Sequence, residues 1–160
     1  VVGIDLSTEA LAAAEKHLET QSIEVNYRQS SAEALAETEP GRYDLVACME
    51  LLEHVPDPGS IIRACARLVK PGGDIFLSTI NRTPLAYLLL IPAAEHLLGI
   101  VEKGTHHYRK FVRPGELARW GKSAGLQALD CSGFMYVPFL GKAWLTRRAP
   151  ANYMMHMRKV

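Results

Sequence analysis

The chain has 160 residues, of which 48% are hydrophobic and 22% are charged, so we expect one soluble domain with a single core. Its formal net charge of +1 gives no broad electrostatic case for a nucleic-acid-binding protein. Three scattered cysteines, Cys48, Cys65 and Cys131, argue against a disulfide framework and predict reduced thiols in a cytosolic protein.

The chain opens on a strand-like segment without a signal peptide or an initiator Met, so we expect it to be a fragment of a longer protein. Residues 1–6 are predicted to form a short buried strand, and Ser7 or Thr8 then caps an amphipathic helix. A second strand over residues 23–27 ends in a small polar loop at residues 30–33. A short helical patch and a Pro-Gly turn lead into the next strand, which indicates βαβ units.

The strand that organises the chain is predicted over residues 43–49. After Asp44 its residues are continuously apolar, which suits a parallel strand that is buried on both faces. Glu50, Glu53 and His54 follow at once. Because ligands of open α/β sheets bind outside the carboxyl ends of the strands, these three groups indicate an active site.

A further helix and strand continue the pattern. Asp57 and Pro58 open the helix as N-cap and first-turn proline, and a Pro-Gly-Gly sequence ends it. Residues 74–80 form another apolar strand, and Asn81 lies just past its carboxyl end, on the ligand side of the sheet. This recurrence predicts a doubly wound, mostly parallel α/β sheet in one domain over residues 1–160.

Residues 83–103 break the rhythm with many large apolar side chains and a proline, Pro92. The segment is too short and too polar to span a bilayer. It is either a helical insertion that packs over the active site or an amphipathic hairpin that lies in a membrane interface. The basic residues that flank it are Lys103, Arg109, Lys110 and Arg113.

The remaining chain is predicted to return to the sheet. After the loop that contains His106 and His107, a helix is expected over residues 114–124 and a strand over residues 126–136. A final strand over residues 153–160 shows alternating large side chains and would close the sheet.

The residues alone leave several roles open. Asp5 follows a strand, where it would accept hydrogen bonds from the ribose hydroxyls of a nucleoside cofactor or merely cap the next helix. Met49, at a strand end, would contact a flat ring such as adenine or belong to the core.

The Glu50, Glu53 and His54 cluster also allows more than one interpretation. In a helical turn these side chains share one face, and two carboxylates with an imidazole suit a divalent cation. His106 or His107 would supply a fourth ligand. The alternatives are a helix-start cluster favoured by the macrodipole, or His54 as the general base for a hydroxyl group.

Longer patterns resemble a known family. The segments VVGIDLS, YDLVACMELLEHVPDP and LVKPGGDIFLSTINR resemble class I S-adenosylmethionine-dependent methyltransferases, which have a Rossmann-like sheet. The combination C-M-E-x-L-E-H-V-P-D-P, S-T-I-N-R, G-T-H and N-Y-M-x-H is similar to one branch, the ubiquinone-biosynthesis O-methyltransferases, which methylate polyprenylated catechols. The resemblance covers essentially the whole chain. It implies that the family's first strand and glycine-rich loop precede residue 1, that the insertion follows the fifth family strand, and that the fragment alone binds cofactor poorly.

The resemblance implies a cofactor site for S-adenosylmethionine. By matching positions, Asp5 would bind the ribose of the cofactor and Met49 would line the adenine pocket. Ser31 and Ala32 would contribute from the loop nearby.

The resemblance also implies a metal-assisted reaction. Glu50, Glu53 and His54 would hold a divalent metal such as Mg²⁺, with His106 as the preferred fourth ligand, and His54 is the predicted catalytic residue. The metal would lower the pKa of the attacking catechol hydroxyl and hold it in line with the sulfonium methyl.

The implied partners are a polyprenylated catechol and a membrane surface. The segment from Pro84 to Val101, with the nearby basic residues, would dock on the bilayer, which predicts a cytoplasmic protein at the periphery of the inner membrane. A complex of ubiquinone-biosynthesis proteins is a further expected partner, and no nucleic acid is expected. The alternatives are a metal-dependent RNA 2′-O-methyltransferase, or a methyltransferase-like subunit that binds lipid or serves assembly without catalysis.

Overall fold

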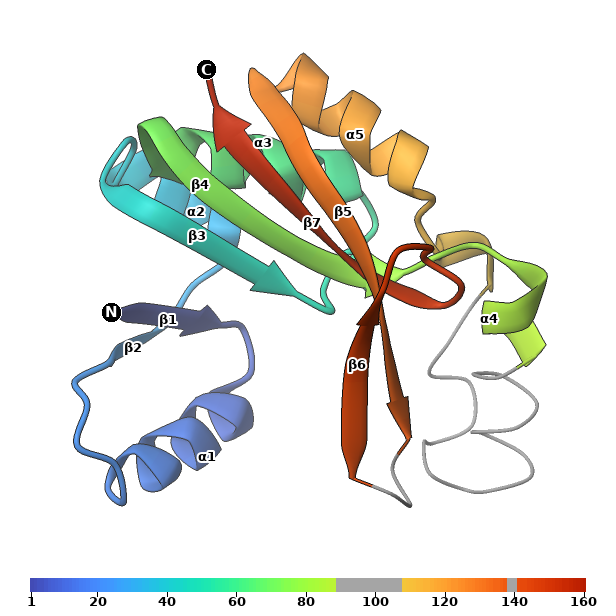
Figure 1. Ribbon diagram of the computed structural model, residues 1–160. Helices are drawn as coiled ribbons and strands as arrows, with labels where there is room; N and C mark the ends of the chain where they lie inside the picture. Colours follow the sequence, from blue (N-terminus) through green and yellow to red (C-terminus); the bar gives the residue numbers. More distant parts are fainter. Residues whose placement is uncertain (89–107, 138–140) are drawn as a thin grey trace.

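The computed structural model describes residues 1–88, 108–137 and 141–160 (Figure 1). The helices in this part are α1 (Thr8–Leu18), α2 (Ala32–Thr38), α3 (Pro58–Leu68), α4 (Pro84–Leu88), a 3₁₀ helix (Tyr108–Lys110) and α5 (Pro114–Ser123). The strands are β1 (Val2–Asp5), β2 (Asn26–Gln29), β3 (Tyr43–Met49), β4 (Val69–Ile80), β5 (Leu126–Val137), β6 (Lys142–Thr146) and β7 (Asn152–Lys159). Within these ranges, no helix is long and apolar enough to cross a bilayer.

The strands form two sheets. β1 and β2 pair in parallel as a small separate sheet, and β3-β4-β7-β5-β6 form a larger one (Figure 1). In the larger sheet β3 and β4 are parallel, whereas β4 with β7, β7 with β5 and β5 with β6 are antiparallel. The predicted α/β class is confirmed.

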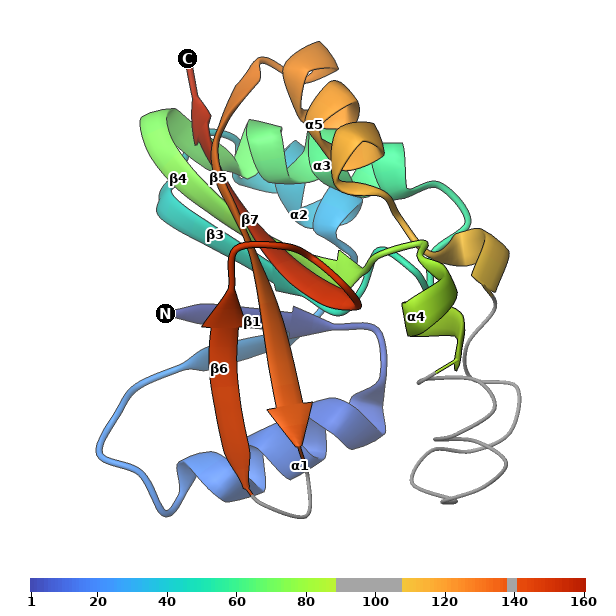
Figure 2. The same cartoon turned by 45° about the vertical axis from the view of Figure 1, so that its right-hand side comes forward.

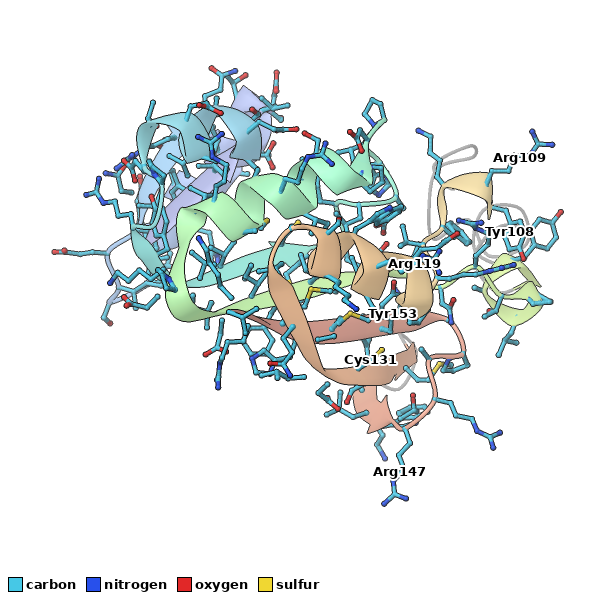
Figure 3. All side chains as sticks on the ribbon, turned by 90° about the horizontal axis from the view of Figure 1, so that it is seen from above. Tyr108, Arg109, Arg119, Cys131, Arg147 and Tyr153 are labelled. Carbon is cyan, nitrogen blue, oxygen red and sulfur yellow. The ribbon has the colours of Figure 1, made fainter. Side chains whose placement is uncertain are left out.

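Helices α3 and α5 cover one face of the larger sheet, with α2 beside α3 (Figures 1 and 2). The core between them is well packed, because Ile62 of α3, Leu77 of β4 and Tyr153 of β7 are fully buried. Tyr153, labelled in Figure 3, also donates a hydrogen bond from its hydroxyl to the carbonyl of Val112 at 3.0 Å. This core fixes the positions of the strands whose ends carry the candidate site.

The capping residue and the proline in the sequence predict the start of α3 correctly. Asp57 accepts a hydrogen bond from the backbone N–H of Ser60 at 3.2 Å, and Pro58 occupies the first turn, as the sequence predicts. The helix ends at Leu68, directly before β4. A single capping residue and a proline therefore define where α3 begins.

Several strand predictions differ from the structure. β4 begins at Val69 rather than at residue 74, and β1, which was predicted to be buried, has no buried residue. The prediction that residues 43–49 are buried on both faces is wrong, since Leu45 is 53% exposed and Met49 is 47% exposed. Among the described residues, β3 pairs with β4 along one edge, and its other edge faces a cavity. The second strand covers Asn26–Gln29 rather than residues 23–27, because its pairing with β1 begins at Asn26.

The predicted insertion at 83–103 begins with α4, and residues 89–107 lie outside the described part. Its two flanks are held together. Arg82 donates hydrogen bonds to the carbonyl of Phe111 and to the carboxylate of Glu116, both at 2.8 Å, and the N–H of Val112 donates to the carbonyl of Ile80 at 2.9 Å. The segment therefore leaves and rejoins the fold at the carboxyl end of β4.

Candidate active site

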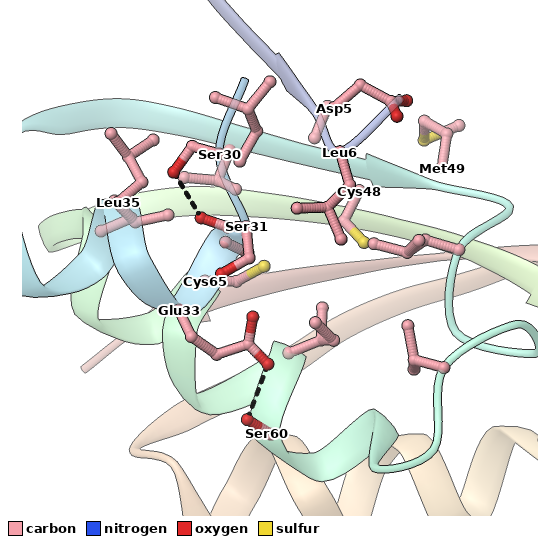
Figure 4. A pocket seen from close by; sticks show the side chains of 18 of the residues that line it. Asp5, Leu6, Ser30, Ser31, Glu33, Leu35, Cys48, Met49, Ser60 and Cys65 are labelled. Carbon is pink, nitrogen blue, oxygen red and sulfur yellow. Dashed lines mark hydrogen bonds between the residues drawn. The ribbon is translucent and has the colours of Figure 1, made fainter. Parts of the chain in front are cut away.

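A cavity of about 830 Å³ lies between the small sheet and β3 (Figure 4). Its walls are mainly apolar, and they consist largely of the facing edges of β1 and β3. The four residues that the sequence assigns to the cofactor all line it: Asp5, Ser31, Ala32 and Met49. They come from the carboxyl ends of β1 and β3 and from the loop after β2, so the topology brings together residues that are far apart in the sequence.

Asp5 is the last residue of β1 and lines this cavity. Its Oδ1 atom accepts a hydrogen bond from the backbone N–H of Ser7 at 2.8 Å, and Ser7 itself caps α1. The interpretation of Asp5 as the cap of the helix is therefore wrong, because Ser7 is the cap. One oxygen of Asp5 supports the turn before the helix, and the exposed carboxylate also borders the cavity. A carboxylate in this position is able to accept hydrogen bonds from hydroxyl groups of a bound molecule.

The loop between β2 and α2 forms the opposite wall. Ser31 is the N-cap of α2 and accepts a hydrogen bond from the N–H of Ala34 at 3.1 Å. Glu33 accepts a hydrogen bond from the hydroxyl of Ser60 at 2.9 Å, which ties the loop to α3 (Figure 4). Across from them, the exposed side chain of Met49 presents a flexible thioether suited to contact with a flat ring.

Glu50 follows β3 in an unusual backbone conformation, with φ at 50°. Its N–H points at Ser78 of β4, with distances of 3.1 Å to the carbonyl oxygen and 3.0 Å to Oγ. Ser78 in turn donates its hydroxyl proton to Oε1 of Glu50 at 2.7 Å. Asn152, the first residue of β7, donates to Oε2 of Glu50 at 3.2 Å. Three strands therefore fix the direction of this carboxylate.

Glu53 is a buried carboxylate beside Glu50, with only 4% of its surface exposed. Thr79, which is fully buried, donates its hydroxyl proton to Oε2 of Glu53 at 2.6 Å. The other oxygen, Oε1, is buried and receives no hydrogen bond from a donor of the described residues. Such an atom is costly unless something outside the described residues satisfies it.

The pKa of Glu50 reflects these surroundings. Although the residue reaches the surface at the sheet edge, its carboxyl is crowded by protein atoms, and this desolvation raises its pKa above the ordinary value. Hydrogen bonds from Ser78 and Asn152 oppose the increase, whereas the charge of Glu53 adds to it. Two carboxylates held this close would gain from a cation between them.

The structure brings together part of the predicted metal cluster. Residues 51–54 form a turn, with a hydrogen bond from the N–H of His54 to the carbonyl of Leu51 at 2.9 Å, so the predicted helical turn is wrong. Glu50 and Glu53 meet, but His54 is exposed. Across the described ranges, no set of three His, Cys, Asp or Glu side chains is grouped to hold a metal ion, and the predicted ligand His106 lies outside these ranges.

Sequence reasoning missed three residues of this site: Ser78, Thr79 and Asn152. The signal in the sequence was weak, namely a polar pair near the end of an otherwise apolar strand. The sequence pattern points instead to Asn81, which has a structural role, because its buried side chain donates to the carbonyl of Ala149 at 2.6 Å. The three donors are recognisable only once the strand register is known.

Comparison with known proteins identifies relatives over almost the whole chain. Residues 1–77 match the family model described as a methyltransferase domain. The chain is 49% identical over 158 residues to a ubiquinone biosynthesis O-methyltransferase of Methylococcus capsulatus, covering 99% of the chain and 67% of that protein. It is 48% identical to the protein of that name from Pseudomonas aeruginosa, covering 99% and 68%. The chain thus spans about two thirds of the length of these curated relatives.

Solved structures support the same fold. A SAM-dependent methyltransferase from Methanosarcina mazei superimposes with a TM-score of 0.71 at 19% identity, covering 100% of this chain and 82% of the other. An S-adenosylmethionine-dependent methyltransferase from Mesorhizobium loti gives a TM-score of 0.65 at 18% identity, covering 99% and 80%. At these identities the likeness concerns the fold alone.

Proposed function

The chain belongs to the ubiquinone biosynthesis O-methyltransferase family, and from this premise we propose that it transfers the methyl group of S-adenosylmethionine to a catechol hydroxyl of polyprenylated intermediates. The substrates would be a polyprenyl hydroxyphenol and demethylubiquinol. The observation that carries the proposal is the pair of carboxylates, Glu50 and Glu53, directly after the strand end at which Met49 lines the cavity together with Asp5.

The cavity suits the nucleoside part of S-adenosylmethionine. Asp5 would accept hydrogen bonds from the ribose hydroxyls, and Met49 would pack against the adenine ring. Ser31 and Ala32 would line the same pocket from the α2 side. Met49 immediately precedes Glu50 in the chain, so the cofactor site and the carboxylate pair adjoin each other.

The residues present fit a divalent cation. The pair supplies carboxylate oxygens, which Mg²⁺ prefers, and the buried Oε1 of Glu53 lacks a donor among the described residues. Glu50 and Glu53 would hold the ion, with His54 and His106 as further proposed ligands. When bound, the cation would supply positive charge that lowers the pKa of the catechol hydroxyl.

The protein's own residues would orient and deprotonate the substrate. Ser78 and Asn152 keep the Glu50 carboxylate in place, and Thr79 does the same for Glu53. In the alternative arrangement, in which His54 does not ligate the ion, this exposed imidazole next to the pair would take the hydroxyl proton as general base. The catechol oxygen then forms a bond to the methyl carbon while the carbon–sulfur bond breaks, which leaves S-adenosylhomocysteine.

The polyprenyl tail and the membrane surface would contact the protein beside the sheet edge that carries Glu50 and Glu53. The segment from Pro84 to Val101 begins at the carboxyl end of β4, and its residues Leu85 and Tyr87, in α4, are exposed. Arg109 and Lys110 follow the segment. These features support the proposal that the protein lies at the periphery of the inner membrane and meets other ubiquinone-biosynthesis proteins there.

The test is transfer of a labelled methyl group from S-adenosylmethionine to a short-tailed prenyl catechol by the full-length protein, with and without a chelator. We expect transfer that is lost with chelator, restored by Mg²⁺, and abolished by Glu50→Gln with Glu53→Gln. Glu15→Gln on the exposed face of α1 is the matched control. Transfer insensitive to chelator would leave His54 as base without a metal. Transfer to RNA but to no catechol would refute the proposal.

A further inference from the structure

The hairpin formed by β5 and β6 extends beyond the body of the larger sheet (Figures 1 and 2). β5 pairs with β7 as far as Phe134, which lies opposite Asn152, and with β6 from Gly133 to Val137. Residues past Phe134 thus have one described strand neighbour. Because Asn152 also donates to Glu50, the base of this hairpin adjoins the carboxylate pair.

The hairpin exposes large apolar side chains on both of its faces. Trp144 is 48% exposed and Leu145 is 73% exposed, and adjacent residues of a strand point to opposite faces. A free two-stranded ribbon with such side chains is a liability in water unless it meets a partner. Tryptophan is the residue type that is enriched where one side is apolar and the other is wet, as at a membrane interface.

The charged residues of the outer part of the hairpin, residues 133–148, are all basic. Residues 131–160 contain no Asp or Glu. Lys142, Arg147 and Arg148 are exposed, and none of them forms an ion pair with a described residue. Figure 3 shows Arg147 projecting away from the fold. Cations beside exposed Trp and Leu side chains complement a surface that is anionic outside and apolar beneath.

We propose that the β5–β6 hairpin is a membrane-docking element that binds an anionic lipid bilayer through Trp144, Leu145 and the three cations around them. It is separate from the segment Pro84 to Val101. The inference deepens the proposed function and rests on it for the purpose of docking, because a hairpin seated on the bilayer would turn the neighbouring Glu50 and Glu53 edge towards a lipid-dissolved substrate.

A bilayer fits this surface better than a nucleic acid does. Leu145 is the more exposed of the two apolar residues, and an aliphatic side chain gains little from stacked bases but gains fully from burial among acyl chains. The balanced net charge of +1 also provides no extended basic surface for a phosphate backbone. The local cluster of cations is large enough to attract a layer of anionic lipid headgroups.

The first experiment uses the fluorescence of Trp144 to detect contact between the hairpin and a bilayer. These 160 residues contain two tryptophans, so Trp120→Phe leaves Trp144 as their sole tryptophan, and any tryptophan elsewhere in the full-length protein is replaced by Phe in the same variant. We expect vesicles of equal parts phosphatidylglycerol and phosphatidylcholine to shift the Trp144 emission to the blue and to protect it from acrylamide. Pure phosphatidylcholine vesicles should do so much less. Vesicle binding without a Trp144 response, or no binding at all, would overturn the proposal.

Charge variants provide the second arm. Arg147→Gln with Arg148→Gln should weaken binding to the anionic vesicles about fivefold per charge, hence about 25-fold. Lys16→Gln with Lys122→Gln, on exposed faces of α1 and α5, is the matched control and should change little. Equal loss in both double variants would refute a local role. A Trp144 response to single-stranded RNA but not to vesicles would replace the bilayer by a nucleic acid.

The outcome is distinguishable from failure of the proposed function. Methyl transfer to a short-tailed catechol in solution needs no bilayer, so the hairpin variants should retain it. If the wild type lacks that transfer but Trp144 enters the bilayer, the proposed function fails and the docking surface stands. If transfer is normal and Trp144 stays in water, only the docking surface fails.

Discussion

Replacing Thr79 by Val tests whether the strand β4 positions the buried carboxylate of Glu53. The two side chains have nearly the same shape, but Val lacks the hydroxyl that donates to Oε2 of Glu53 at 2.6 Å. Both partners are buried, and Glu53 already has one oxygen without a described donor. A hydrogen bond to a charged group contributes about 1.5–3 kcal/mol, so we expect Thr79→Val to lower the free energy of unfolding by about 2 kcal/mol.

Urea denaturation of the full-length protein at neutral pH, without divalent cations, measures this loss. Thr20→Val is the matched control, because the Thr20 hydroxyl bonds to an exposed carbonyl at 2.8 Å, and its effect should stay within about 0.5 kcal/mol. In a Glu53→Gln background the acceptor is neutral, and Thr79→Val should cost about 1 kcal/mol. An equal cost in both backgrounds would show that the hydroxyl does not serve the Glu53 charge.

Three other predictions concern single groups. Because the pKa of Glu50 is raised in the folded protein, its contribution to stability is fully present below its unfolded-state pKa and is lost as the pH rises through its folded-state pKa. Glu50→Gln should therefore flatten this part of the pH profile of urea unfolding in cation-free buffer. An unchanged profile would refute the raised pKa of Glu50. Asp5→Asn keeps an acceptor for the Ser7 N–H but removes the charge, so S-adenosylmethionine affinity measured by calorimetry should fall about tenfold with little loss of stability. Unchanged affinity would leave Asp5 with only its structural role in the turn before α1. Ile62→Ala should lower the free energy of unfolding, measured in urea, by about 2–5 kcal/mol, because Ile62 is fully buried on the face of α3 that packs in the core. A cost below about 1 kcal/mol would contradict that packing.

Features that depend on neighbours in the sequence could be predicted. The start of α3 follows from Asp57 and Pro58, whose capping chemistry acts within one turn. The ends of β1 and β3 were placed well because apolar runs stop abruptly at Asp5 and Glu50. The cofactor-lining residues were therefore within reach of sequence reasoning, although their roles stay predictions.

Features that depend on strand register could not be predicted. Ser78 reaches Glu50 because β3 and β4 pair Met49 with Ser78, and Asn152 reaches it because β7 pairs Asn152 with Ile80. The sequence between residues 50 and 152 contains no local signal of this pairing. β6 was missed for the same reason, since its existence depends on pairing with β5 and all but one of its residues are exposed.

The backbone at Glu50 explains why a turn replaces the expected helix and why the carboxylates are fixed in advance. A left-handed φ of 50° costs a residue other than glycine about 1–2 kcal/mol. The bonds that Ser78 exchanges with the N–H and the carboxylate of Glu50 offset that cost, and they hold only if the chain leaves β3 at this angle. The same angle lets Glu53 fold back to Thr79. The strain at one residue therefore helps to bring together the two carboxylates to which the proposed function assigns a divalent cation.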